Sequence, residues 1–316
     1  MARNDKSHVT VSVQHLIERN IGKRKKAQRI NQMAPFVLRI IASISIVTTI
    51  GIIATLANET FMFFDRVSIH SFFTEKEWLP FFENPKFGIL PLIYGTVLVT
   101  IIAMVVAIPI GLGCAIFLSE YASSAARKIL KPALELLAGI PTIVYGFFAL
   151  TVVTPILQHI VPDLQFFNAL SPGIVIGIMM IPTIASLSED AMRAVPQQVR
   201  EASFAIGATR FETAKNIVLP AAFTGVVAAI LLAASRAVGE TMIVVIAGGS
   251  TPSLSLNPTQ SIQTLTAYIV QVSLGDAPYG TLTYYSMYAV GATLFIFTLI
   301  MNMIAQYIMR RFKEAA

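Results

Sequence analysis

Long uncharged, apolar segments dominate the chain and alternate with short charged ones. They cover residues 40–58, 87–119, 136–162, 164–188, 216–235, 241–275 and 277–309. Most reach the roughly 20 residues that an α-helix needs to cross the hydrocarbon core of a bilayer. The pattern predicts membrane-spanning helices at about residues 36–58, 91–118, 133–156, 171–188, 219–247 and 282–308. We therefore expect an all-α integral membrane protein with six transmembrane helices.

Composition supports a membrane protein. Of the 316 residues, 55% are hydrophobic and 13% are charged, whereas about 25% are charged in an ordinary soluble domain. One water-soluble core could not hold so much apolar side chain. The single cysteine, Cys114, excludes a disulfide framework within the chain.

Basic residues concentrate in alternate connecting segments. One side would carry most of them: Arg3, Lys6, Arg19, Lys23, Arg24, Lys25, Lys26, Arg29, Arg39, Arg127, Lys128, Lys131, Arg193, Arg200, Arg210, Lys215, Arg310, Arg311 and Lys313. The other side would carry only Arg66, Lys76 and Lys86. Because cytoplasmic loops are rich in Lys and Arg, we expect both termini to be cytoplasmic. The +6 net charge needs no nucleic-acid partner, and the first apolar run reads as a retained anchor.

Three parts follow along the chain. Residues 1–35 form a basic cytoplasmic arm, residues 36–90 hold the first membrane helix and a long outer loop, and residues 91–310 form the core. The outer loop contains Trp78 and several Phe residues, so it should cap the membrane surface or lie in the interface. A short amphipathic or re-entrant piece is expected around residues 262–272.

Charge returns in a compact block in the middle of the chain. Its members are Glu189, Asp190, Arg193, Arg200, Glu201, Arg210, Glu212 and Lys215. Pro196 is suited to start a helix, and Val199, Ala202 and Ile206 then share one helical face. Gly207 is placed to end that helix in a left-handed cap. The block, near 196–215, predicts helix–glycine–helix, either a solvated turn or a docking element.

The spacing within this block matches a known signature. Its positions are Glu201, Ala202, Gly207, Ile217, Leu219 and Pro220. They resemble the loop signature of permease subunits of ATP-binding-cassette (ABC) importers, with Ser203 where that family has a second Ala. The resemblance implies a type I importer permease (MetI-like) core. It also implies that the segment is a coupling helix that inserts into a separate ATPase subunit.

The chain holds no G-x-x-x-x-G-K-[ST] phosphate loop. We therefore expect no cofactor in this chain, with ATP and Mg²⁺ bound by the partner ATPase. No catalytic or metal-binding residues are expected. An intramembrane enzyme is a weaker alternative, because His159 stands alone and no paired carboxylates share a membrane helix.

Two charges interrupt the predicted fifth membrane helix. Arg236 lies sixteen residues beyond Pro220, about 24 Å along a helix at about 1.5 Å per residue. Glu240 follows four residues later and is expected on the same face. The pair is either a structural ion pair or an anion site on the translocation path, where the Arg fork suits oxyanions. Gly239, between them, would permit close helix approach.

A closer resemblance concerns the cargo. The stretches "SRAVGETM", "FGILPLIYGT" and "AGIPTIVYGFFAL" resemble PstC-type permease subunits of phosphate importers, from about Trp78 to the C-terminus. This implies phosphate import across a bacterial inner membrane, a second homologous permease, a dimeric ATPase and a periplasmic phosphate-binding protein. The alternatives are a permease for sulfate or molybdate and, less favoured, an ion-gradient-driven transporter.

Overall fold

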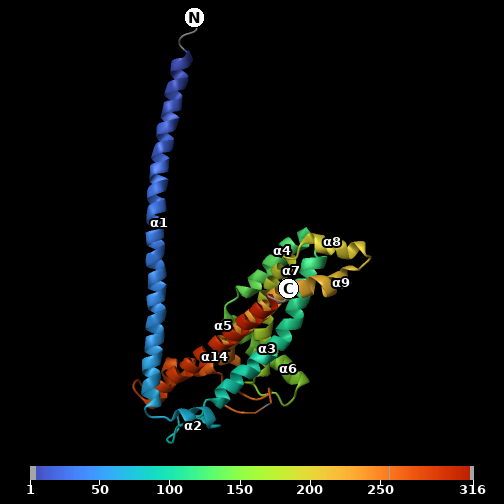
Figure 1. Ribbon diagram of the computed structural model, residues 1–316. Coiled ribbons are helices and arrows are strands. Elements are labelled where there is room, and N and C mark those ends of the chain that lie inside the picture. The colour runs from blue at the N-terminus through green and yellow to red at the C-terminus, as the bar shows by residue number, and fades with distance from the viewer. Residues whose placement is uncertain (1–4, 256, 314–316) are drawn as a thin grey trace. The chain divides into compact units, whose positions relative to one another are not determined.

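The computed structural model describes residues 5–255 and 257–313, and most of them are helical (Figure 1). The chain forms two compact units, residues 1–58 and 59–316. The described part of the first unit belongs to one long helix, α1 (Asp5–Phe64), whose last turns continue into the second unit. Large apolar side chains such as Ile44, Val47 and Ile50 are exposed along it. A bilayer is the solvent in which such a surface is stable.

The second unit contains the remaining elements. Its outer loop forms α2 (Ile69–Thr74), β1 (Trp78–Leu79) and β2 (Lys86–Phe87). The helices that follow are α3 (Leu90–Ile116), η1 (Phe117–Tyr121), α4 (Ser124–Ala138), α5 (Thr142–Phe148), η2 (Ala149–Val153), α6 (Thr154–Ile160), α7 (Leu170–Arg193), α8 (Gln197–Ala205), α9 (Arg210–Thr213), η3 (Ala214–Val218), α10 (Leu219–Ala221), α11 (Phe223–Val238), α12 (Met242–Ala247), α13 (Leu265–Gln271), η4 (Val272–Asp276) and α14 (Leu282–Lys313). The four η segments are π-helical.

Membrane-spanning length and composition confirm the predicted class. Among the described residues, five helical stretches qualify as spans: Met33–Phe64, Leu90–Tyr121, Thr142–Ile160, Leu170–Arg193 and Leu282–Arg310. A bent pair, Arg210–Ala221 with Phe223–Val238, qualifies as a sixth when it is taken as one span. The all-α membrane architecture is therefore confirmed, while the predicted division into residues 1–35, 36–90 and 91–310 stays a prediction.

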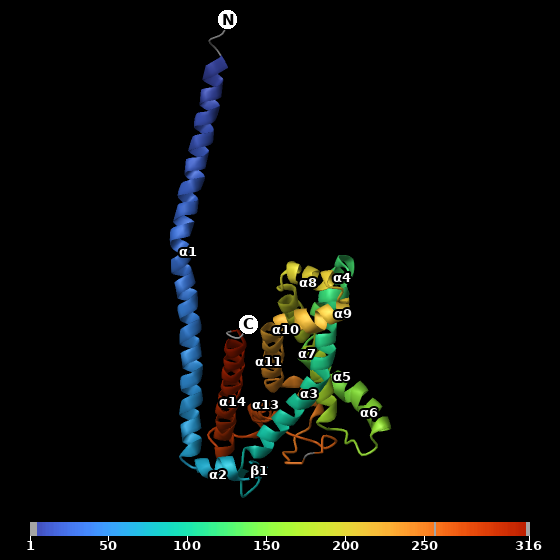
Figure 2. The same ribbon diagram turned by 45° about the vertical axis from the view of Figure 1, so that its right-hand side comes forward.

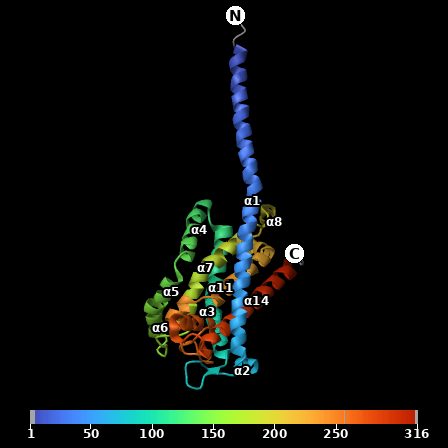
Figure 3. The ribbon, with the colours of Figure 1, turned by 90° about the vertical axis from the view of Figure 1, so that its left-hand side faces the viewer.

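The helix predicted at 133–156 begins and ends elsewhere. Residues up to Ala138 belong to α4, and the span starts at Thr142 and ends at Ile160 (Figure 3). Gly139 caps α4, and Pro141 precedes α5 in an extended conformation. Proline disfavours helical geometry in the residue before it, so the helix restarts only after Pro141.

The helix predicted at 219–247 is interrupted twice. Its two parts meet at Ala222 with a bend of 74°. Helix α11 then ends at Val238, and α12 starts only at Met242. A single continuous fifth helix was therefore a wrong prediction.

Glycine brings the two central helices together. Helices α3 and α7 pack against each other near the centre of the second unit (Figure 2). A Cβ at Gly173 would lie 2.6 Å from Cγ2 of Ile102, and one at Gly177 would lie 2.7 Å from the carbonyl oxygen of Ala103. Small residues permit this close approach, which is typical of helices packed within membranes.

The outer loop folds into an aromatic cap on the second unit. Strands β1 and β2 pair antiparallel, and the Trp78 ring packs edge-on against Phe87 and Tyr268. Tyr268 belongs to the buried helix α13, which lies where a short amphipathic or re-entrant piece was expected, around residues 262–272. Helices α8 and α9 lie at the opposite end of this unit from α2 (Figures 1 and 2).

Candidate functional site

The signature segment, residues 196–220, turns its apolar face outward. Val199 and Ile206 of α8 are exposed, Ile206 by 87%, and Ala202 is exposed beside them. On the opposite face, the polar residues Arg200 and Ser203 are buried. A short helix that presents apolar side chains at the surface and buries polar ones is suited to dock into another protein.

Gly207 forms the bend that the sequence predicts. Its φ is +91°, a left-handed backbone conformation that residues other than Gly and Asn rarely adopt. Its N–H donates to the carbonyl oxygen of Phe204 at 2.9 Å, and the N–H of Ala208 donates to that of Ser203 at 3.2 Å. These two bonds form a Schellman motif, so the predicted glycine cap is confirmed.

The next helix begins with a capping box that the sequence analysis missed. The Thr209 N–H donates to Oε2 of Glu212 at 2.8 Å, and the Glu212 N–H donates to Oγ1 of Thr209 at 3.3 Å. The T-x-x-E spacing was the available signal. Together, the glycine cap and the capping box fix the angle between α8 and α9.

Ser203, the departure from the family pattern, has a specific contact. Its Oγ lies 2.9 Å from Oγ1 of Thr213, and both residues are buried. The hydroxyl thus joins α8 to the end of α9. Close packing survives the substitution, with a hydrogen bond added.

Of the remaining signature residues, Glu201 lies in α8, whereas Ile217, Leu219 and Pro220 lie in the turn that leads into α11. Glu201 is exposed, Ile217 and Leu219 are half-buried, and Pro220 is exposed. Leu219 packs against an apolar cluster that includes Met192 and Val218. The motif therefore combines surface positions on α8 with positions that anchor the segment to the core.

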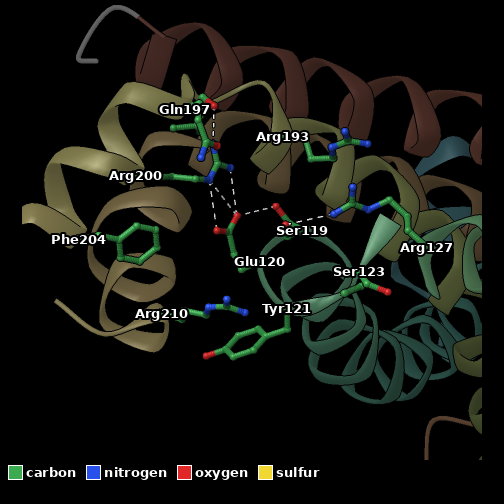
Figure 4. A pocket seen from close by; sticks show the side chains of 12 residues that line it. Ser119, Glu120, Tyr121, Ser123, Arg127, Arg193, Gln197, Arg200, Phe204 and Arg210 are labelled. Carbon is green, nitrogen blue, oxygen red and sulfur yellow. Dashed lines mark hydrogen bonds and ion pairs between the residues drawn. The ribbon is translucent and has the colours of Figure 1, made fainter. Parts of the chain in front are cut away.

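A polar cavity of 630 Å³ opens between α8 and the end of α3 (Figure 4). It is lined by Ser119, Glu120, Tyr121, Ala122, Ser123, Arg127, Arg193, Val195, Gln197, Arg200, Phe204 and Arg210. Its central contact is an ion pair between Arg200 and Glu120, with Nη2 3.1 Å from Oε1. The charge of Arg200 is visible in the sequence, whereas its partner Glu120, eighty residues earlier, is not.

A second ion-pair cluster surrounds Glu189, which is fully buried at the end of α7. Nζ of Lys131 lies 2.7 Å from Oε2 of Glu189 and 2.6 Å from Oδ1 of Asp190. Arg127 and Arg193 each lie 3.5 Å from Oε1 of Glu189. Burial lowers the pKa of Lys131, but the hydrogen bonds and charges of Asp190 and Glu189 outweigh burial and raise it overall.

Arg236 and Glu240 do not lie as a helical pair. Arg236 occupies the last turn of α11 and is exposed, whereas Glu240 lies beyond the end of that helix and is buried. The two side chains form no salt bridge within the described structure, although the charge of Arg236 still acts on the Glu240 carboxylate. Because α11 ends at Val238, the regular four-residue helical relation expected of the two residues is not kept.

Glu240 instead faces the backbone that follows it. The Ile243 N–H points at Oε1 of Glu240, 3.5 Å away, and Oγ1 of Thr266 donates to the Glu240 carbonyl oxygen at 2.9 Å. Gly239 is exposed, and a Cβ there would meet only carbonyl oxygens of Arg236 and Ser235, at 3.7 and 3.9 Å. Among the described residues, no atom of another helix lies within 4 Å of that Cβ position.

The exposure of Arg236 is chemically informative. Thirteen residues separate it from Phe223, which is a rise of about 20 Å at about 1.5 Å per residue. An exposed guanidinium at such a depth is unfavourable against lipid, so it must face a polar cavity or another protein chain. Its planar N–H donors can form two parallel hydrogen bonds to one oxyanion.

Comparisons with known proteins place these features in a family. Residues 107–314 match the model of the family described as "Binding-protein-dependent transport system inner membrane component". The "Probable ABC transporter permease protein YqgH" of Bacillus subtilis is 33% identical over 98% of this chain and 99% of its own length. The "Phosphate transport system permease protein PstC" of Xylella fastidiosa (strain Temecula1) is 37% identical over 76% of this chain and 79% of its own.

Solved structures show the same fold. A bacterial ABC transporter for import of the acidic polysaccharide alginate aligns with a TM-score of 0.62 at 16% identity, covering 90% of this chain and 98% of that chain. The MetNI methionine ABC transporter aligns with a TM-score of 0.57 at 19% identity, covering 71% and 95%. The fold is thus that of the type I (MetI-like) ABC importer permeases. This multi-pass membrane protein belongs to the family of binding-protein-dependent transport system inner membrane components, the membrane subunits of ABC importers.

Proposed function

We propose that this permease moves inorganic phosphate inward across the inner membrane without changing it chemically. The observation that carries the proposal is Arg236, the only basic residue between Lys215 and Arg310, exposed at membrane depth. A guanidinium there suits a tetrahedral oxyanion. Relatives named as phosphate transport system permease proteins support phosphate as the cargo.

Glu240 would set how tightly the anion is held. Its carboxylate forms no ion pair with Arg236, so the guanidinium remains available to phosphate. A nearby negative charge still weakens anion binding by electrostatic repulsion. Arg236 would therefore bind the passing anion while Glu240 favours its release. Gly239 would leave room for a neighbouring helix of a partner chain.

The partners follow from what this chain presents. The exposed apolar face of α8 would insert into a dimeric ATPase, which would bind ATP and Mg²⁺, since this chain has no phosphate loop. Glu201, Ala202 and Gly207 would contact or shape that interface. Ile217, Leu219 and Pro220 would connect it to α11.

A second homologous permease would complete the pathway, and a periplasmic phosphate-binding protein would deliver the anion. One solved relative is an alginate ABC transporter in complex with a periplasmic protein.

The transport cycle would then be driven by two steps in the ATPase, closure of its dimer and hydrolysis of ATP. Closure of the ATPase dimer would displace α8 and open the pathway outward, and phosphate would enter and pass Arg236. Hydrolysis of ATP by the partner would return the bundle to its inward-facing state. The basic segments on one side of the membrane support an orientation with both termini in the cytoplasm.

Reconstitution tests this function. The complete complex, assembled with its ATPase, second permease and binding protein, is placed in liposomes, and ATP hydrolysis and anion uptake are measured. Phosphate is compared with sulfate and molybdate, each with its own binding protein. We expect only phosphate to stimulate hydrolysis and to accumulate; stimulation by sulfate or molybdate instead would contradict phosphate as cargo.

A further inference from the structure

Arg200 connects α8 to a membrane helix eighty residues earlier in the chain. Its Nε lies 3.2 Å from Oε2 and 3.4 Å from Oε1 of Glu120, and its Nη2 lies 3.1 Å from Oε1. Only 10% of the Arg200 side chain and 6% of the Glu120 side chain are exposed. Figure 4 shows the two groups in direct contact beside the other residues that line the polar cavity. Burial leaves this pair little screened by salt.

The rest of the guanidinium binds the end of α7. Nη1 donates to the carbonyl oxygen of Val195 at 2.6 Å, and Nη2 donates to that of Met192 at 2.7 Å. Ser119 adds a hydrogen bond from its Oγ to Oε1 of Glu120 at 2.7 Å. Arg200 thus holds together three elements: α8, the end of α7 and the end of α3. A planar guanidinium can make these contacts at once, whereas a lysine cannot.

Glu120 leads directly into the membrane bundle. It lies in η1, the π-helical turn that continues α3 without a break. Ala103 and Ala107 of α3 share an apolar core with Ala233 and Ala237 of α11. Arg236 lies on that same α11, so a shift of Glu120 would reach the helix that carries the anion-binding arginine.

The covalent chain offers α8 a less direct connection to α3. Residues 194–196 join α8 to α7, and Gly207 separates it from α9. Without the ion pair, a displacement of α8 would reach α3 through α7, or through the Ser203–Thr213 hydrogen bond and the segment that follows α9. The pair supplies a short, buried connection to α3 itself.

We propose that the Glu120–Arg200 ion pair transmits the displacement of α8 to α3 and so couples ATP hydrolysis to transport. Both are positioning residues, since neither touches the anion or the nucleotide. The inference rests on the proposed ATP-driven function but does not depend on which oxyanion is carried.

The test measures anion transported per ATP hydrolysed in the complete reconstituted complex, with phosphate as the first probe. Glu120→Gln keeps the side-chain shape and removes the charge. We expect the ratio to fall at least about fivefold, the lower range of typical coupling between sites. Arg200→Gln and the double variant should give the same fall, because two residues acting as one unit are not additive.

Glu77→Gln is the matched control, because Glu77 pairs with Lys86 at 2.6 Å but both side chains are more than half exposed. Its ratio should equal that of the unaltered complex. An assembled Glu120→Gln complex with an unaltered ratio overturns the inference. If that variant does not assemble, as judged by co-purification of the ATPase, Glu120→Asp is measured with the same expected fall.

An unaltered ratio in Glu120→Asp, or failure of both variants to assemble, also overturns the inference, since the pair would then serve the fold alone. The proposed function fails differently. If phosphate does not stimulate ATP hydrolysis in the unaltered complex, phosphate as cargo is wrong, and the ratio is measured with the oxyanion that does.

Discussion

The signature segment and the end of α11 each carry charged residues in a largely apolar chain, but the two regions differ in the burial and pairing of their arginines. In the signature segment, Arg200 is buried and all its donor groups contact Glu120 or backbone carbonyls. At the end of α11, Arg236 is exposed and forms no ion pair with Glu240. A charge that is fully partnered within the chain serves structure and coupling. One that is exposed at membrane depth, with no salt bridge to any described residue, is available for something outside the chain.

The largest expected effect concerns the exposed charge. Arg236→Gln should remove about 2–5 kcal/mol of interaction with the anion. Phosphate uptake should therefore fall by a factor of about thirty or more. Uptake of labelled phosphate by the assembled complex measures it. Arg66→Gln, an exposed arginine in the outer loop, is the control and should transport normally. Normal uptake by Arg236→Gln would remove the distinction between the two regions.

Gly207→Val addresses the geometry of the signature segment. A β-branched residue at φ +91° is strained by about 1–3 kcal/mol, although no neighbouring atom would clash with it. We expect reduced co-purification of the ATPase or loss of phosphate-stimulated ATP hydrolysis. Gly207→Asn, which tolerates a left-handed conformation, should retain more of both. Unchanged stimulated hydrolysis in Gly207→Val would argue against α8 as the docking helix.

Ser203→Ala restores the family pattern but removes a hydrogen bond. The buried Thr213 hydroxyl would lose its partner, so we expect a loss of about 1 kcal/mol in stability. Thermal unfolding of the purified permease measures this loss. The double variant Ser203→Ala/Thr213→Val, which removes both polar groups, should be closer to the unaltered protein. A double variant less stable than Ser203→Ala would show that the bond matters less than side-chain packing.

The smallest effect concerns the cluster at Glu189. The pKa of Lys131 is raised above 10.5 in the folded protein, so its ion pairs contribute fully below that pH and are lost as pH rises through the folded pKa. Thermal stability should therefore fall as the pH rises above about 10.5, and less steeply in Lys131→Met. If thermal stability fell equally steeply with pH in both proteins, the ion pairs of Lys131 would not contribute to stability.

The bend at Gly207 was predictable because it depends on local chemistry. Glycine is the residue that tolerates a positive φ, and its spacing within the signature is visible in the chain. The restart of the third span after Pro141 had a visible signal too, yet the uncharged run beginning at 136 concealed it. The break after Val238 is harder to foresee, since the apolar pattern continues past it. Glu240 there contacts Ile243 and Thr266, and the contact with Thr266 depends on a segment 26 residues later.

The sequence by itself determined the membrane class, the basic asymmetry and the family signature, because hydropathy, charge and short-range spacing are properties of the linear chain. Tertiary structure alone decided which charges meet. Glu120 and Arg200 are eighty residues apart and pair only because α3 and α7 end side by side. Arg236 and Glu240 are four residues apart, yet one is exposed and the other buried, because the helix ends at Val238 between them. Ion pairing depends on distance in space, and a chain that folds back on itself sets that distance independently of the distance along the sequence.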